Sequence, residues 1–199
     1  GIYRTGLHDD LKIPLAGATP ARIRMPHRNK NGQYDNWAKT SLPWMSIGYE
    51  TQIPPISTLT FYNTIANNGK MMRPRFVSKV MKNGETIMEF PPEVMRQQIA
   101  KEKSIKELQT ILEQVVSVGL GKKAGSPNFK VAGKTGTAQI SKGAGGYKSG
   151  GTSYLISFAG YFPADAPRYS CIVCIQKSGL PASGGTMCGK VFHEISEGI

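Results

Sequence analysis

Three extended, apolar segments in the second half of the chain constrain the fold most strongly. They cover about residues 129–140, 153–162 and 169–176, and turn-forming residues separate each from the next. Successive strands joined in this way predict an antiparallel meander. The run from Leu155 to Phe162 is apolar at consecutive positions, which indicates a strand buried on both faces. We therefore expect helices to cover both faces of the sheet.

Helical patterns flank these strands. A helix is predicted over residues 55–68, since Pro55 opens it and Asn67-Asn68-Gly69 supplies a stop. A second helix should open at a capping box formed by Ser104 and Glu107 and close at Gly119. Its apolar face is expected to comprise Ile105, Leu108, Ile111, Leu112, Val115 and Val116. With a final helix over about 185–198, the predicted fold class is α/β in the broad sense (α+β), an antiparallel sheet flanked by helices.

The remaining segments predict smaller elements. Residues 75–81 and 86–90 should form a hairpin, because Asn83-Gly84 between them is a strong turn signal. Frequent proline and glycine residues in the first 50 positions indicate loops and short elements there.

The formal net charge of +12 limits the classes of partner. A basic chain suits nucleic acid, an anionic membrane surface or anionic wall polymers. The basic residues are scattered, however, and no run of five or more occurs, which favours an ordinary solvated surface. A nucleic-acid-binding module would also need aromatic and basic residues interleaved on one face, and the sequence shows no such pattern. No nucleic-acid partner is expected, and this module is kept only as a weaker alternative.

The three cysteines do not predict a metal site. Cys171 and Cys174 form a C-x-x-C motif, but no second pair or spaced histidine pair follows it. Side chains three apart in a strand point to opposite faces, so these two thiols should not bridge each other. Buried free cysteines are expected, and neither a metal nor another cofactor is predicted.

The segment Val131–Ala138 carries the most chemical information. Gly133-Lys134-Thr135 matches the end of a phosphate-binding loop, but Asn128 stands where the first glycine belongs and a strand rather than a helix follows. The alternative is Lys-Thr-Gly-Thr on a strand beside an acylation site. There Lys134 would supply a fixed positive charge, threonine hydroxyls could hold a carboxylate, and a backbone N–H could face a developing oxyanion. K-T-G is one signature of serine β-lactamases and penicillin-binding proteins.

Residues 131–139 resemble the third active-site motif of class B penicillin-binding transpeptidases. The resemblance extends to Met45–Glu50, to residues 54–70 with Arg73-Pro74, and to Ser153–Pro163, and so covers about residues 36–199. Trp37 to Tyr49 resembles members that act in cell division more than those that maintain cell shape. The resemblance implies the fold of serine β-lactamases and penicillin-binding transpeptidases.

The resemblance also implies serine acyl transfer in peptidoglycan synthesis. The family's serine attacks a D-alanyl-D-alanine stem peptide, releases D-alanine and passes the acyl group to an amine, and β-lactams acylate the same serine. By motif, Lys134 is the catalytic lysine, Thr135 and Thr137 would hold the carboxylate, the Thr137 N–H would be an oxyanion donor, and Gly136 would keep the strand open. Stem peptides, β-lactam antibiotics and cell-wall synthesis proteins are the implied partners. The implied location is the periplasmic, extracytoplasmic face of the inner membrane, anchored by a segment outside this sequence.

Two further family motifs, S-x-x-K and S-x-N, have no convincing match here. No serine is followed by lysine at the third position. Ser126-Pro127-Asn128 and Tyr34-Asp35-Asn36 match S-x-N or its variant by letter, but both positions are wrong for the family. Since the chain opens at Gly1 without methionine, we expect residues 1–199 to be the C-terminal part of one transpeptidase domain, inactive alone. A non-catalytic β-lactam sensor domain of the same fold is the main alternative.

Overall fold

The computed structural model describes residues 1–140 and 152–199 of the chain. These residues form two compact units, Gly1–Thr58 and Leu59–Ile199. The Gly-rich link predicted between the first two strands, Ser141 to Gly151, lies outside the described residues.

The first unit consists of short elements, as the sequence predicts. It contains the helices α1 (Ile2–Thr5) and α2 (Ser41–Ser46) and the two-residue strands β1 (Arg22–Ile23) and β2 (Thr51–Gln52). Strands β1 and β2 pair antiparallel. Helix α3 (Pro55–Ala66) begins in this unit and ends in the second. It starts at the predicted proline, and Asn68 and Gly69 adopt positive φ angles of 53° and 95° just after it.

The second unit is built on a three-stranded antiparallel sheet. Its strands are β7 (Ala132–Ile140), β8 (Ser153–Phe162) and β9 (Tyr169–Ser178), in the spatial order β7-β8-β9. Ala132 pairs with Tyr161, and Phe162 pairs with Tyr169. The predicted meander is therefore confirmed, and β7 begins three residues later than the apolar pattern indicates.

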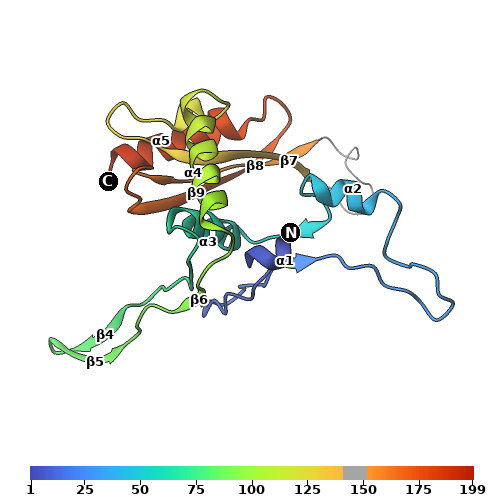
Figure 1. Cartoon of the computed structure of the whole chain (residues 1–199), viewed down its shortest axis with the longest axis horizontal. Helices are drawn as coiled ribbons and strands as arrows, with labels where there is room; N and C mark the ends of the chain where they lie inside the picture. Colours follow the sequence, from blue (N-terminus) through green and yellow to red (C-terminus); the bar gives the residue numbers. More distant parts are fainter. Residues whose placement is uncertain (141–151) are drawn as a thin grey trace. The chain divides into compact units, whose positions relative to one another are not determined.

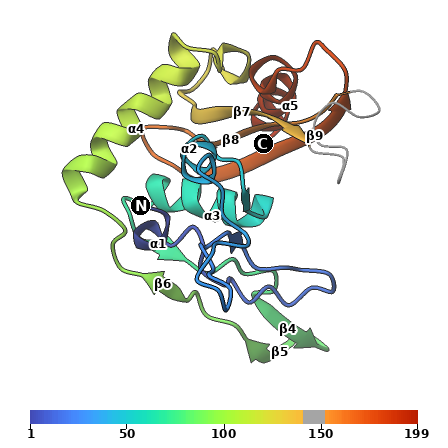
Figure 2. The same ribbon diagram turned by 90° about the vertical axis from the view of Figure 1, so that its right-hand side faces the viewer.

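Helices cover both faces of this sheet, because β8 is apolar on both (Figures 1 and 2). On one face Ile156, Phe158 and Phe162 pack against Phe192 of helix α5 (Gly189–Glu197). On the other face Tyr161 packs with residues of α3 and with Leu112 of helix α4 (Glu102–Ser117). Phe158 and Phe192 meet edge to face, with ring centroids 4.8 Å apart.

Helix α4 corrects one sequence prediction. It begins at Glu102 with Lys101 at the N-cap position, so Ser104 lies inside the first turn and the predicted capping box is wrong. A lysine at the N-cap makes no side-chain cap bond. The i, i+4 ion pair between Lys106 and Glu102, at 2.7 Å, instead places opposite charges along the exposed face of this turn.

The segment predicted as one final helix, about residues 185–198, contains two helical elements. A π-helical turn, η3 (Gly184–Cys188), leads directly into α5 (Gly189–Glu197). A 3₁₀ turn, η1 (Lys122–Ala124), follows α4. Both turns pack against the sheet side that carries Phe158.

The predicted hairpin forms from β4 (Lys79–Lys82) and β5 (Glu85–Glu89). Asn83 and Gly84 have φ angles of 51° and 85°, as a tight hairpin turn requires. Every residue of both strands is exposed, and Figure 1 shows the hairpin extending away from the sheet of its unit. The short strands β3 (Met71–Met72) and β6 (Val94–Arg96), which the sequence does not predict, pair antiparallel beside its base.

The cysteine predictions are confirmed only in part. All three thiols are free, but only Cys188 is buried, while Cys171 is half-buried and Cys174 is exposed. Burial raises the pKa of each of the three thiols. Among the described residues, no helix is both long enough and apolar enough to span a bilayer.

Candidate active site

Strand β7 places the motif Lys134-Thr135-Gly136-Thr137 at the edge of the sheet. Among the described residues β7 pairs only with β8, so its second edge has no strand partner. Thr135 and Thr137 lie opposite Phe158 and Ile156, on the face that α5 covers. Lys134 and Gly136 lie on the other face, because alternate residues of a strand point in opposite directions.

The ammonium group of Lys134 folds back along its own strand. Its Nζ donates to the Thr135 carbonyl oxygen at 2.8 Å and to Thr135 Oγ1 at 3.3 Å. The side chain is exposed, so the positive charge stands at the strand edge rather than within the core. Because Thr135 Oγ1 accepts this bond, its own O–H can donate elsewhere.

The Thr137 hydroxyl is held in a similar way from a distant part of the chain. Gly184, the first residue of η3, donates its backbone N–H to Thr137 Oγ1 at 3.3 Å. Thr137 itself is exposed. Both threonine hydroxyls thus accept a hydrogen bond from the protein and retain a proton to donate to an anion.

Gly136 lies beside a side chain of the neighbouring strand. A Cβ at this position would lie 2.5 Å from Ser157 Oγ, on the neighbouring strand. The hydroxyl of Ser157 is the end of a side chain and can rotate away, so the predicted role of Gly136 in keeping the strand open stays a prediction. Lys134, Thr135, Gly136 and Thr137 are brought together as predicted, but their roles in substrate binding stay predictions.

The letter match Ser126-Pro127-Asn128 lies apart from this motif, in a turn that closes on itself. Ser126 Oγ accepts the N–H groups of Asn128 and Phe129 at 2.9 and 3.3 Å. Asn128 Nδ2 donates to Glu197 Oε2 at 2.9 Å. Hydrogen bonds from Ser126 and Asn128 lower the pKa of the Glu197 carboxyl. These contacts explain both side chains structurally.

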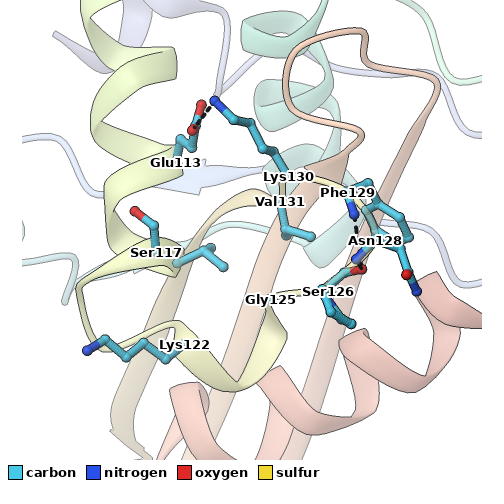
Figure 3. A pocket seen from close by; sticks show the side chains of 11 residues that line it. Glu113, Ser117, Lys122, Gly125, Ser126, Asn128, Phe129, Lys130 and Val131 are labelled. Carbon is cyan, nitrogen blue, oxygen red and sulfur yellow. Dashed lines mark hydrogen bonds and ion pairs between the residues drawn. The ribbon is translucent and has the colours of Figure 1, made fainter.

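This turn borders an open cavity of about 640 Å³ between α4 and the residues that lead into β7 (Figure 3). Lys130 and Glu113 close one end of it through an ion pair of 2.8 Å, which raises the pKa of Lys130. Ser126 Oγ accepts two backbone N–H groups of its own turn, and no lysine stands at the third position after it. We therefore assign the candidate site to the β7 edge rather than to this cavity.

The second letter match, Tyr34-Asp35-Asn36, is explained within the first unit. Asn36 accepts the His27 N–H at 2.8 Å and donates to the Met25 carbonyl at 2.9 Å, which closes a loop. Among residues 1–140 and 152–199, no cluster of three or more histidine, cysteine or acidic side chains could hold a metal ion.

Sequence reasoning missed Gly184 and Gly185, which meet β7 from η3. The only signal was the pair itself, Gly184-Gly185 after Ser183, in a segment read as the start of a helix. Glycine is unfavourable inside a helix, so two in succession indicate close approach by another backbone.

Comparison with known proteins identifies the family that this chain resembles. The model of the penicillin binding protein transpeptidase domain matches residues 19–197. PbpB of Mycolicibacterium smegmatis is 31% identical over 173 residues, which are 81% of this chain and 26% of that protein. The peptidoglycan D,D-transpeptidase FtsI homologue of Mesostigma viride is 26% identical over 77% of this chain and 28% of its own length. The chain thus spans about a quarter of the length of these relatives.

Solved structures show the same fold. Penicillin binding protein 3 of Mycobacterium tuberculosis, complexed with aztreonam, superposes with a TM-score of 0.77 and 26% identity over 98% of this chain and 44% of that one. The transpeptidase domain of Burkholderia pseudomallei penicillin-binding protein 3 gives a TM-score of 0.67 at 26% identity, covering 98% of this chain and 54% of that domain.

Proposed function

This chain belongs to the penicillin-binding protein transpeptidase family, as a class B member of the division type, and from that membership we propose that it supplies one side of a serine acyl-transfer site. The parent protein would be a peptidoglycan D,D-transpeptidase that β-lactams acylate. Residues 1–199 would form the C-terminal part of its transpeptidase domain. The periplasmic face of the membrane is its proposed location.

The edge of β7 carries this proposal. Lys134 places a fixed positive charge there, and the hydroxyls of Thr135 and Thr137 each keep a proton available for an anion. A stem peptide ends in a carboxylate, and a β-lactam carries an acid beside its reactive ring. We propose that both acids bind to the two threonine hydroxyls near Lys134, through charge-assisted hydrogen bonds.

The proposed reaction has two acyl transfers. A serine oxygen attacks the carbonyl carbon of the penultimate D-alanine, and the Thr137 N–H stabilises the oxyanion that forms. The C–N bond then breaks, D-alanine leaves with a proton, and an acyl-serine ester remains. An amine of a second stem peptide attacks this ester, which forms the cross-link and returns the proton to serine.

The nucleophile of this reaction must come from outside the 199 residues. No serine here has a lysine at the third following position, and Ser126 is used in its own turn. Nucleophile and oxyanion donor must converge on one carbon, so we propose that these residues alone cannot be acylated. Stem peptides and cell-wall synthesis proteins are the proposed partners of the parent.

Covalent labelling tests the proposal. The parent protein should bind a fluorescent penicillin covalently, and Lys134→Ala should slow this labelling by about 10- to 100-fold, typical of the loss of a hydrogen bond to a charged group. Lys177→Ala is the matched control, because Lys177 also donates along its own strand, to the Ser178 carbonyl at 3.3 Å, on the other outer strand. It should label at the parent rate.

Three outcomes would contradict parts of the proposal. An adduct on the 199-residue chain would show a nucleophile within it. A parent that never labels would end the acyl-transfer assignment. A parent that labels but releases no D-alanine from a stem peptide would favour the β-lactam sensor alternative.

A further inference from the structure

A glycine of the η3 turn packs directly against the backbone of strand β7. Gly184, at the start of η3, is buried against both β7 and β8. A Cβ at Gly184 would collide with the carbonyl oxygens of Gly136 and Ser157, and it would lie 3.1 Å from the Gly136 nitrogen. Both obstacles are backbone atoms of a paired sheet, so neither can swing aside as a side chain would.

The Gly136 carbonyl belongs to the same peptide group as the Thr137 N–H. A trans peptide is planar, and its C=O and N–H point in opposite directions. Because Gly184 meets the Gly136 oxygen together with Ser157 of β8, this carbonyl lies on the β8 side of β7. The Thr137 N–H therefore points toward the unpaired edge, and any tilt of the carbonyl also tilts that N–H.

Neighbouring residues fix Gly184 in place. A Cβ at Gly185 would collide with the Leu120 carbonyl and lie 3.1 Å from Thr135 Cγ2. Ser183 caps the turn, since its Oγ accepts the Thr186 N–H at 3.2 Å. Gly184 also donates its own N–H to Thr137 Oγ1. The turn therefore contacts the motif strand at Thr135, Gly136 and Thr137.

We propose that Gly184 is a positioning residue that sets the plane of the Gly136–Thr137 peptide, and with it the aim of the oxyanion-donating N–H. The inference rests on the proposed acyl-transfer function and adds to it a residue 47 positions away from Thr137 in the sequence. A larger residue at 184 would push η3 and β7 apart. The oxyanion would then meet a misdirected donor, while the charge of Lys134 stayed in place.

The experiment separates binding from chemistry in the parent protein. Stopped-flow acylation by a fluorescent penicillin yields a dissociation constant and a limiting acylation rate constant. Losing one oxyanion donor slows catalysis by about 10²–10³, so a misdirected donor in Gly184→Ala should slow the limiting rate by about 10- to 100-fold. The dissociation constant should change much less, because Lys134 and the Thr135 hydroxyl remain.

Gly198, the C-cap residue of α5, serves as a control. At Gly198 a Cβ would lie no closer than 3.4 Å to Glu194 O, which is ordinary contact, so Gly198→Ala should acylate at the parent rate. A folded Gly184→Ala protein with an unchanged limiting rate would overturn the inference. So would a defect confined to the dissociation constant.

If Gly184→Ala does not fold, variants at Ser183 test the inference instead. Ser183→Ala adds no clash but removes the cap, and loosening the turn should lower the limiting rate roughly two- to five-fold. Ser183→Thr keeps a capping hydroxyl and should restore the rate. An unchanged rate in Ser183→Ala would then overturn the inference. If the parent labels but these variants match it, only this inference fails, whereas a parent that never labels removes the proposed function itself.

Discussion

Tyr161 shows how a single buried polar group responds to its surroundings. Its ring is fully buried on the α3 and α4 side of the sheet, and its hydroxyl has no hydrogen-bond partner within residues 1–140 and 152–199. Burial, together with the negative charge of Glu113, raises its pKa to about 12. An unpartnered buried hydroxyl costs free energy that its aromatic ring must offset by packing.

Replacing Tyr161 with phenylalanine should therefore not destabilise the protein. Tyr161→Phe keeps the packed ring and removes a desolvated hydroxyl, which should leave the free energy of unfolding unchanged or raise it by about 1 kcal/mol. Calorimetry of the parent and the variant at neutral pH measures this difference. A loss of more than about 1 kcal/mol would indicate that the hydroxyl has a partner after all.

The same residue should contribute to alkaline unfolding. In the folded protein Tyr161 stays neutral up to about pH 12, whereas in the unfolded chain it ionises near the ordinary value of 10.0. The contribution of Tyr161 to the free energy of unfolding is therefore fully present below pH 10, and it is lost as the pH rises from 10 toward 12. The thermal midpoint of Tyr161→Phe should fall less steeply across this range, and parallel curves would contradict the assignment.

At the level of elements, helix α4 illustrates how local signals can mislead. Ser104 and Glu107 have the spacing of a capping box, but the helix begins at Glu102. Buried contacts of Ile105, Leu112 and Val116 stabilise the helix more than a cap would, because burying an aliphatic side chain contributes about 1.5–3 kcal/mol. The extra turn then brings Glu102 within ion-pair distance of Lys106.

Two serine substitutions should distinguish a serine inside a helix from a serine that caps one. Ser104→Ala should raise the free energy of unfolding by up to about 0.5 kcal/mol, because alanine is the better helix former inside a turn. Ser183→Ala removes a true cap and should lower it by about 1 kcal/mol. Thermal unfolding of the two variants measures both effects. A clear loss of stability in Ser104→Ala would indicate that Ser104 does cap the helix.

At the level of the whole molecule, strand β8 supports the fold from both faces. Ile156, Phe158 and Phe162 contact one helical layer, while Tyr161 contacts the other. Strand β7 pairs with β8, and η3 packs over both strands at Gly136 and Ser157, so the geometry of the motif depends on packing within the second unit. Substitutions in β8 should therefore affect stability strongly wherever both faces are covered.

Two residues of β8 provide a matched test. Phe158 is fully buried, so Phe158→Ala should lower the free energy of unfolding by about 3–5 kcal/mol. Leu155, on the same strand, is 43% exposed, so Leu155→Ala should cost less than about 1.5 kcal/mol. Equal losses, measured by calorimetry of the parent protein, would mean that Leu155 is covered there by another segment.

The sequence by itself determined the elements whose signals are local. Alternating and continuous apolar runs predicted β8 to the residue, and Asn83-Gly84 predicted the hairpin turn because few other pairs adopt two positive φ angles. The motif Lys134-Thr135-Gly136-Thr137 was predicted from its resemblance, together with the surrounding segments, to a family motif, and its strand was predicted from the extended run at 129–140. Family membership followed from the order of such segments.

Only the tertiary structure decided what depends on distant partners. The start of α4, the pairing of β3 with β6 and the exposure of Cys174 follow from packing, which overrides local preference. It also showed that a Cβ at Gly136 would meet the Ser157 hydroxyl and that Gly184 touches the motif strand. Contacts between residues 47 positions apart leave no periodic signal, since they arise only when the sheet and its covering turn come together.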